Sequence, residues 1–180
     1  MQTYIALLRG INVGGTVSLK MKDLAATLKA AGFEAVRTYI QSGNVVFSCQ
    51  EGDAAVLAVR MTDCINAAFG VAPSVIVLPA EEVAAIAADN PFPEATAEPK
   101  FLHFFFLNQA AEAADIAKMT EIAAADERFH LSDRCFYLHT PSGFGRSKLA
   151  ARAEALLGTT ATARNWRTVT TLLEMAGLDG

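Results

Sequence analysis

The chain has 180 residues, enough for the core of one domain or of two small ones, and its net charge of −4 would argue against polyanion binding if that charge were spread evenly. No run of about 18 uncharged apolar residues occurs, which excludes a spanning helix, and the start lacks the features of a signal peptide, so we expect a cytoplasmic protein. Cys49, Cys64 and Cys135 are odd in number and far apart, which fits neither a disulfide framework nor a zinc site, and we expect no metal and no cofactor.

The first half is predicted to follow the element order βαββαβ. Its predicted elements are a strand at 3–9, a helix at 19–31, strands at 35–41 and 45–49, a helix at 53–69, a strand at 74–78 and a short helix near 81–88. Ser18 is the expected N-cap of the first helix and Gly32 its expected end, and the tight turn Ser42-Gly43-Asn44 is typical of a hairpin. In this ferredoxin-like order the first and third strands are central neighbours and the second strand lies at an edge.

The second half repeats this order of elements without a repeat of residues. Its predicted elements are a strand at 101–107, a helix at 110–125, strands at 128–132 and 134–140, a helix at 147–157, a short strand at 159–163 and a last helix at 166–176. The sequence therefore predicts an α+β chain of two tandem ferredoxin-like repeats with antiparallel sheets. Residues 1–90 form the first repeat with a linker helix, and residues 91–180 form the second with a C-terminal helix.

Two strands are apolar on both of their faces. Residues 4–8 and 101–107 carry large apolar side chains at odd and at even positions. Helices cover only one face of a ferredoxin-like sheet, so the other face must meet the other repeat, a loop, or a second copy in a homodimer. We therefore expect the apolar side chains of 101–107 to be largely buried on both faces.

Four motifs follow one another along the chain: YIALLRGINVGG at 4–15, TYIQSGNVVF at 38–47, GFGRSKL at 143–149 and TARNWRTV at 162–169. With these motifs the chain closely resembles a widespread bacterial family that is labelled a domain of unknown function. The resemblance implies a soluble bacterial α+β protein. It supplies no activity, substrate or catalytic residue.

The first polar cluster follows from strand direction. In a ferredoxin-like unit, the loop after the first strand and the turn between the second and third strands share one end of the sheet. The glycines there would let backbone N–H groups approach an anion, and the arginine would add charge. The alternative is that the glycines supply positive φ in turns while the two asparagines bind local backbone. The cluster consists of Arg9, Gly10, Asn12, Gly14, Gly15, Gln41, Ser42, Gly43 and Asn44.

The second half gives a comparable cluster where its second long helix begins and its fourth strand ends. We expect Arg146, Lys148 and Arg164 to converge there on one anion, which would offset the cost of cations at the positive end of a helix dipole. In the alternative, Ser147 and Asn165 cap helices and Trp166 is a buried anchor, while the arginines pair with Asp126, Glu127 or Asp133. The cluster consists of Gly143, Gly145, Arg146, Ser147, Lys148, Arg164, Asn165 and Trp166.

Basic residues are concentrated in the same two regions. Residues 1–50 carry five basic and two acidic side chains, and residues 140–170 carry five and one, whereas residues 51–139 carry five and fourteen. We therefore predict a module that binds a phosphate-bearing ligand, either a small molecule such as a nucleotide or a nucleic acid. The alternatives are a small-molecule enzyme acting on an anionic substrate and an oligomerisation or interaction protein. No catalytic residue is identified, because His103, His130 and His139 lie in apolar strands without a cysteine or carboxylate at ligand spacing.

Overall fold

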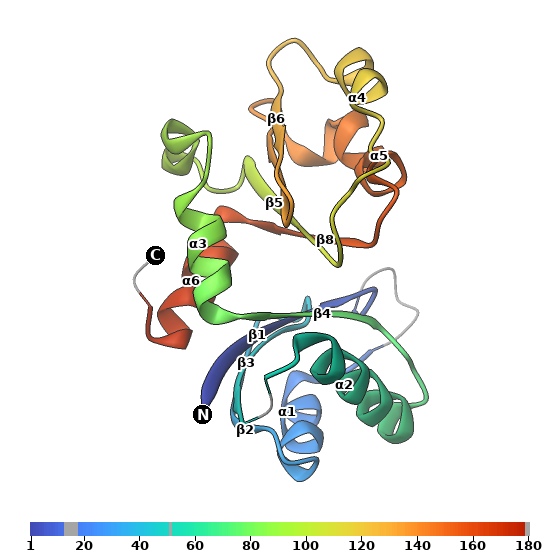
Figure 1. The fold of residues 1–180 in the computed structure, drawn as a ribbon, viewed down its shortest axis with the longest axis vertical. Coiled ribbons are helices and arrows are strands. Elements are labelled where there is room, and N and C mark those ends of the chain that lie inside the picture. Colours follow the sequence, from blue (N-terminus) through green and yellow to red (C-terminus); the bar gives the residue numbers. More distant parts are fainter. Residues whose placement is uncertain (13–17, 51, 179–180) are drawn as a thin grey trace. The chain divides into compact units, whose positions relative to one another are not determined.

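A computed structural model describes residues 1–12, 18–50 and 52–178 of the chain (Figure 1). It forms two compact units. Unit 1 consists of Met1–Ala85 and Thr171–Gly180, and unit 2 of Ile86–Thr170. In the described part of the chain, every helix is too short or too polar to cross a lipid bilayer.

Unit 1 contains a four-stranded antiparallel sheet in the order β2-β3-β1-β4. The elements are β1 (Gln2–Arg9), α1 (Met21–Ala30), β2 (Glu34–Tyr39), β3 (Asn44–Cys49), α2 (Ala54–Phe69), β4 (Ser74–Pro79) and α3 (Ala80–Ala88). Tyr4 of β1 lies opposite Phe47 of β3, and β2 pairs with β3 at one edge. The predicted order, with the first and third strands as central neighbours, is confirmed.

Helices α1 and α2 cover one face of this sheet because each presents an apolar stripe to it (Figure 1). Leu57, Met61 and Ile65 recur every four residues along α2, and all three are fully buried. They pack with the rings of Tyr4 and Phe47, which are stacked at 5.5 Å. The Asp53 carboxylate caps the start of α2 by accepting from two backbone N–H groups.

The start of α1 differs from the prediction. The helix begins at Met21, and its N-cap residue Lys20 makes no side-chain cap hydrogen bond, so the cap predicted at Ser18 is wrong. The reason is that the Asn12 side chain binds both the N–H and the carbonyl of Leu19, which keeps this residue out of the first helical turn.

Unit 2 contains the second four-stranded antiparallel sheet, in the order β6-β7-β5-β8. Its elements are η1 (Pro93–Ala97), β5 (Leu102–Leu107), α4 (Ile116–Ile122), β6 (Arg128–Leu131), β7 (Cys135–His139), η2 (Phe144–Arg146), α5 (Lys148–Leu157) and β8 (Ala161–Asn165), followed by α6 (Trp166–Ala176). Both units thus have the strand order of a ferredoxin-like fold, and the α+β class with two tandem repeats is confirmed.

Helix α4 is shorter than the helix predicted at 110–125. Its first turn is capped by the carboxylate of Asp115, which accepts from the N–H of Lys118 at 2.9 Å. The N–H of Asp115 itself donates to the carbonyl of Leu156 at 2.9 Å, so the chain before α4 is tied to the end of α5 instead of continuing as helix. Tertiary contacts outweigh the alanine-rich propensity of residues 110–114 here.

Strand β5 is buried on both faces, and the prediction for residues 101–107 is confirmed except at Phe101, which precedes the strand. Leu102, Phe104 and Phe106 on one face have at most 1% of their surface exposed, and Phe105 and Leu107 on the other have at most 6%. Phe101 is only partly buried, and the ammonium group of Lys100 lies 4.5 Å from its ring. A single chain therefore covers both faces of β5, and burial of this strand requires no second copy.

Candidate functional site

Asn12 joins the loop after β1 to the turn between β2 and β3. Its Nδ2 donates to the carbonyls of Leu19 and Gln41, both at 2.8 Å, and its Oδ1 accepts the N–H of Leu19 at 2.7 Å. The predicted meeting of this loop and turn is therefore confirmed. Because both Nδ2 hydrogens and Oδ1 are engaged within the chain, Asn12 holds the loop in place.

The hairpin turn is also stabilised from within. Asn44 is fully buried, and its Nδ2 donates to the carbonyl of Tyr39 and the hydroxyl of Ser42, both at 3.0 Å. Gly43 has a φ of +83° and accepts the N–H of Leu8 at 2.8 Å through its carbonyl. These residues have the local turn roles of the alternative interpretation.

Arg9 and Gly10 lie beside an open groove of about 430 Å³, whose other walls are Ile11 and residues 71–74. Arg9 is exposed and Gly10 has a φ of +78°. Gly14 and Gly15, which the sequence placed in the same cluster, lie outside the described residues. Arg9 thus shares this groove with residues 71–74, which precede and begin β4. The motif spacing did not indicate this neighbour.

In the second cluster, two polar side chains cap helices. The hydroxyl of Ser147 accepts the N–H of Ala150 at 2.9 Å at the start of α5, and Oδ1 of Asn165 accepts the N–H of Thr168 at 2.9 Å at the start of α6. Trp166 is half-buried, with its ring 5.5 Å from that of Phe104. Ser147 and Asn165 thus have the capping roles of the alternative interpretation.

Arg146 and Lys148 lie on either side of this cap, and both are exposed. Within residues 1–12, 18–50 and 52–178 neither forms an ion pair. Two of the carboxylates considered for them are engaged elsewhere: that of Asp126 accepts from Ser142 at 2.6 Å, and that of Glu127 accepts the N–H of Ala124 at 3.0 Å. We call Arg146, Ser147 and Lys148 the α5 N-terminal site.

Arg164 does not share the sheet face that this site adjoins. The register of β5 and β8 pairs it with Phe104, so both side chains lie on the same face, and Nη1 of Arg164 donates to the carbonyl of Ala163 at 2.8 Å. Burial lowers the pKa of Arg164 to about 10, so its guanidinium stays charged at neutral pH. Arg146 and Lys148 thus flank the Ser147 cap, whereas Arg164 lies on the other face of the sheet.

His103 connects the two motifs of the second half, although its apolar strand context in the sequence indicated no functional role. It lies opposite Asn165 in the register of β5 and β8, and its ring is stacked on Phe144 with 3.8 Å between the centroids. Its Nδ1 is buried and, among the described residues, has no hydrogen-bond partner. Burial lowers the pKa of His103 to about 4, so the imidazole is neutral at pH 7.

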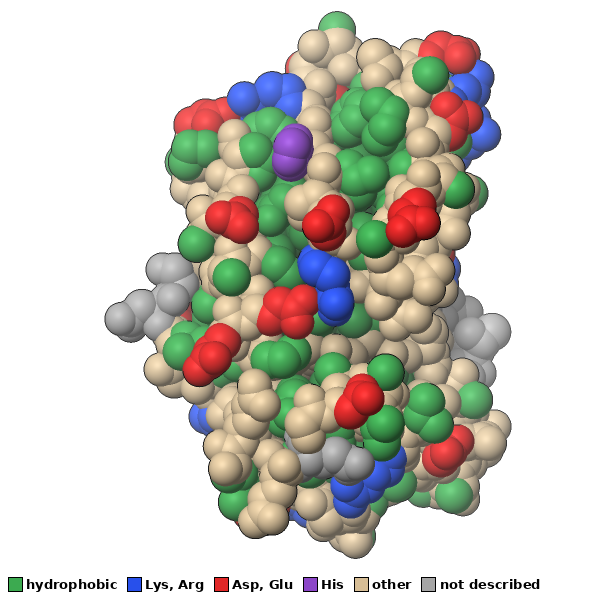
Figure 2. Space-filling view, in the orientation of Figure 1, with side chains coloured by type: hydrophobic (Ala, Val, Ile, Leu, Met, Phe, Trp, Pro, Cys, Tyr) green, Lys and Arg blue, Asp and Glu red, His purple; other side chains and the backbone are tan. Residues whose placement is uncertain are grey.

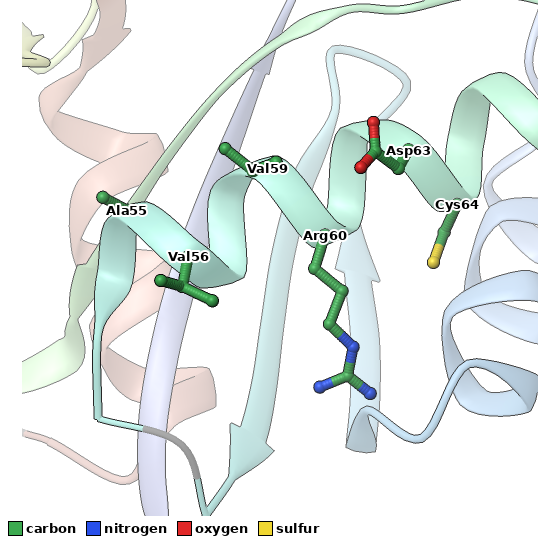
Figure 3. Close-up of a pocket in the computed structure, with 6 residues that line it drawn as sticks. All are labelled: Ala55, Val56, Val59, Arg60, Asp63 and Cys64. Atoms are coloured by element: carbon green, nitrogen blue, oxygen red, sulfur yellow. The ribbon is translucent and has the colours of Figure 1, made fainter.

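A further groove of about 500 Å³ lies along α2 (Figure 3). Val56 and Val59 in it are 46% and 62% exposed, and Cys64 is half-buried. This groove could not be predicted from the sequence, because the apolar residues of α2 are almost continuous and do not show which of them face the sheet. Ala55, Val56, Val59, Arg60, Asp63 and Cys64 line it.

Comparisons with known proteins identify relatives but no activity. A family model described as a protein of unknown function, DUF1697, matches residues 1–137. The fold is similar to that of the conserved bacterial protein SP0830 from Streptococcus pneumoniae, with 22% sequence identity over 97% of this chain and 98% of that chain and a TM-score of 0.77. No curated protein matches the chain.

Proposed function

We propose that the chain, which belongs to the DUF1697 family of proteins of unknown function, binds a phosphate-bearing ligand at the α5 N-terminal site. The supporting observation is the pair of exposed cations, Arg146 and Lys148, at the positive end of a ten-residue helix. A cation in this position is unfavourable by roughly 0.3–1 kcal/mol, and a bound anion offsets that cost because it interacts favourably with the cations and with the helix end.

The chemistry of the two side chains suits a phosphate group. The Arg146 guanidinium can contact two phosphate oxygens at once, and the Lys148 ammonium adds a compact charge. As the first residue of α5, Lys148 also has a backbone N–H that no carbonyl of the helix can accept. The glycines before the helix fit this arrangement, because a Cβ built on Gly143 or Gly145 would meet no atom within 4 Å and the approach to the helix is open.

Thermal unfolding with phosphate compounds tests the proposal. Inorganic phosphate, nucleotides or short oligonucleotides should raise the melting temperature of the parent, and the double variant R146A/K148A should lose that rise. The control is R152A, which removes an exposed cation of the same helix outside its first turn and should keep the rise. An unresponsive parent, or an equal response in the double variant, would contradict the proposal.

Salt dependence separates the two ligand classes. A nucleic acid contacts several phosphates, so its affinity should fall steeply between roughly 50 and 200 mM salt, whereas a ligand with one phosphate group should lose much less. Figure 2 shows acidic and basic side chains interspersed over the face in view, without a large patch of one sign.

A second candidate function, an enzyme acting on an anionic substrate, is favoured by His103. Its neutral imidazole is stacked on Phe144, three residues before Ser147, and could accept a proton from a ligand held by Arg146 and Lys148, although its lowered pKa makes it a weak base at neutral pH. Ligands that stabilise the parent should then be converted during incubation, as followed by NMR. His103→Gln should retain the thermal stabilisation and lose the conversion, and unchanged ligand in the parent would exclude this function.

A further inference from the structure

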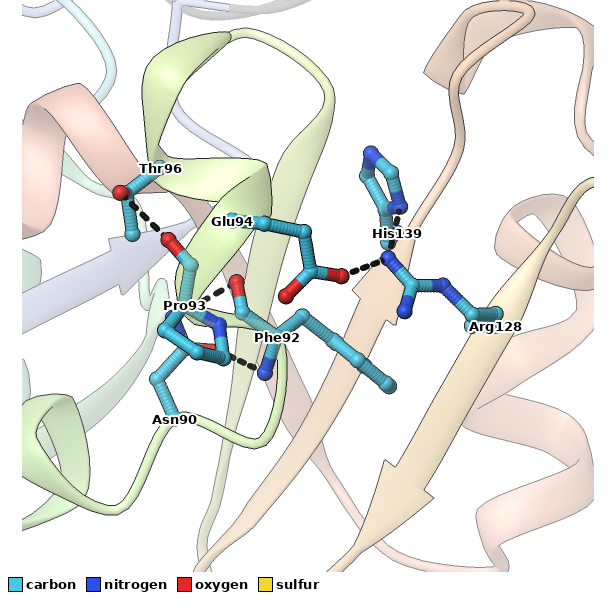
Figure 4. A network of polar contacts seen from close by, with 7 residues as sticks. All are labelled: Asn90, Phe92, Pro93, Glu94, Thr96, Arg128 and His139. Carbon is cyan, nitrogen blue, oxygen red and sulfur yellow. Dashed lines mark hydrogen bonds and ion pairs between the residues drawn. The ribbon is translucent and has the colours of Figure 1, made fainter.

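A second group of side chains in unit 2, separate from the α5 N-terminal site, fastens residues 90–97 to β6 and β7 (Figure 4). Arg128 of β6 lies directly opposite His139 of β7. The same terminal nitrogen of Arg128 donates to the Glu94 carboxylate and contacts Nδ1 of His139 at 3.1 Å. The guanidinium also lies over the ring of Phe92, 4.8 Å from its centroid.

Residues 90–97 are linked by hydrogen bonds of their own. Oδ1 of Asn90 accepts the N–H of Phe92 at 3.0 Å, and the hydroxyl of Thr96 donates to the carbonyl of Pro93 at 2.7 Å. Phe92 is buried, with 8% of its surface exposed, and its ring lies 6.4 Å from that of His139. The segment thus has hydrogen bonds of its own and contacts Arg128 at the sheet edge through Phe92 and Glu94.

The number of hydrogens on the Arg128 nitrogen determines the tautomer of His139. A terminal guanidinium nitrogen carries two hydrogens and accepts none, so one hydrogen serves Glu94 and the other serves His139. Nδ1 of His139 must then be a bare acceptor, with the imidazole proton on Nε2. If Nδ1 gains a proton, two donors face each other across the β6–β7 pair.

Some of the charged groups around His139 lower its pKa and others raise it. Burial and the Arg128 guanidinium lower the pKa of His139, while the carboxylates of Glu94, Asp126 and Glu98 partly oppose them. The directly paired residue on β5, Leu102, is apolar. The net result is a pKa below the usual value of about 6.5, so the ring is neutral at pH 7 and gains its proton in mild acid.

We propose that Arg128 and His139 form a proton-sensitive latch, which holds residues 90–97 on the β6–β7 edge at neutral pH and loosens them in mild acid. Protonation removes the acceptor at Nδ1 and places a second cation beside Arg128. Glu94 is then shared between two cations, and Phe92 loses the fixed guanidinium over its ring. The segment, which joins α3 to β5, becomes more mobile while the sheet remains formed.

NMR spectra of the full chain test the latch directly. Long-range ¹H–¹⁵N spectra should show His139 with a bare Nδ1 at pH 7.5 and a titration midpoint below about 6.5. The backbone amides of Phe92, Glu94 and Thr96 should shift with the same midpoint. Their protection from hydrogen exchange, corrected for intrinsic rates, should fall roughly tenfold, as expected for the loss of one hydrogen bond to a charged group.

Two histidine variants separate the latch from a general effect of acid. His139→Gln keeps an acceptor for Arg128 at every pH, so the amides of residues 92–97 should stop titrating. His130→Gln is the matched control, since His130 is an exposed histidine on β6, and this variant should titrate like the parent. The latch is wrong if the parent segment does not titrate with His139, or if His139→Gln leaves its titration unchanged. The parent titration decides the question alone should His139→Gln fail to fold.

Discussion

The guanidinium of Arg60 on α2 lies 4.6 Å from the ring centroid of Phe33, the residue just before β2. It also donates to the carbonyl of Ala31, the C-cap residue of α1. One side chain thus satisfies a helix-end carbonyl and covers a buried aromatic ring, as seen where Arg60 points away from α2 in Figure 3.

Arg60→Ala should therefore destabilise unit 1 although the residue is partly exposed. The loss of the hydrogen bond to Ala31 and of the cation–π contact with Phe33 predicts a decrease of about 1–2 kcal/mol in the free energy of unfolding. Arg60→Lys keeps a hydrogen-bond donor but loses the planar stack, so its free energy of unfolding should lie between those of the parent and Arg60→Ala. Urea unfolding measures all three proteins, and equal stability of Arg60→Ala and the parent would show that the contact contributes nothing.

Gly43→Ala should be one of the more damaging single-methyl substitutions in the chain. Gly43 has a φ of +83°, and a Cβ there would lie 2.7 Å from side-chain carbons of Ile11 and Leu8. Backbone strain of about 1–2 kcal/mol and a steric clash of about 1–3 kcal/mol should add. Gly70→Ala is the matched control, because its φ is +69° but its Cβ would meet nothing within 4 Å. Urea unfolding should show a clearly larger loss for Gly43→Ala, and equal losses would mean that the turn moves away from the methyl group.

Asn12→Gly and Asn12→Ala should separate the two roles of Asn12. Its φ of +53° suits glycine or asparagine but strains alanine, while both substitutions remove the side-chain hydrogen bonds to Leu19 and Gln41. Asn12→Gly should cost about 1–3 kcal/mol for the unsatisfied backbone groups, and Asn12→Ala should cost more. Urea unfolding measures both. If Asn12→Gly leaves the free energy of unfolding unchanged, water replaces the side-chain hydrogen bonds of Asn12.

The order of elements could be predicted from the sequence because it depends on local signals. Apolar runs, the Ser42-Gly43-Asn44 turn and the glycines after the helices can each be recognised within a few residues of sequence. The start of α1 could not be predicted, since it is set by Asn12, seven residues away from Leu19. Local propensity favoured Ser18 as a cap, and a tertiary hydrogen bond overrode it.

The candidate site was only partly predictable for a similar reason. Strand direction was enough to bring Asn12 to the hairpin, and to bring the segment before α5 to the end of the sheet where β8 finishes. The face on which a strand residue lies depends on register, and a shift of one residue reverses it. Arg164 was therefore placed with Arg146 and Lys148, although its partner Phe104 puts it on the other face of the sheet.

The pH dependence of stability should report the burial of His103. Because folding lowers the pKa of this base from its usual 6.5 to about 4, the unfolded chain binds the extra proton first. The contribution is fully present above about pH 6.5 and is lost as the pH falls toward 4. Between neutral pH and pH 5, protonation of His103 should lower the free energy of unfolding by about 1–2 kcal/mol, a value that already allows for the partial exposure of the ring.

His103→Gln isolates this contribution from that of His139, whose lowered pKa acts in the same direction. Glutamine does not titrate, so the variant should lose less stability than the parent between pH 7.5 and pH 5, by that same 1–2 kcal/mol in urea unfolding. His130→Gln, at an exposed position, should lose as much as the parent. If the parent and His103→Gln lose equal amounts, the imidazole is already solvated in the folded state, and its stack on Phe144 opens before protonation.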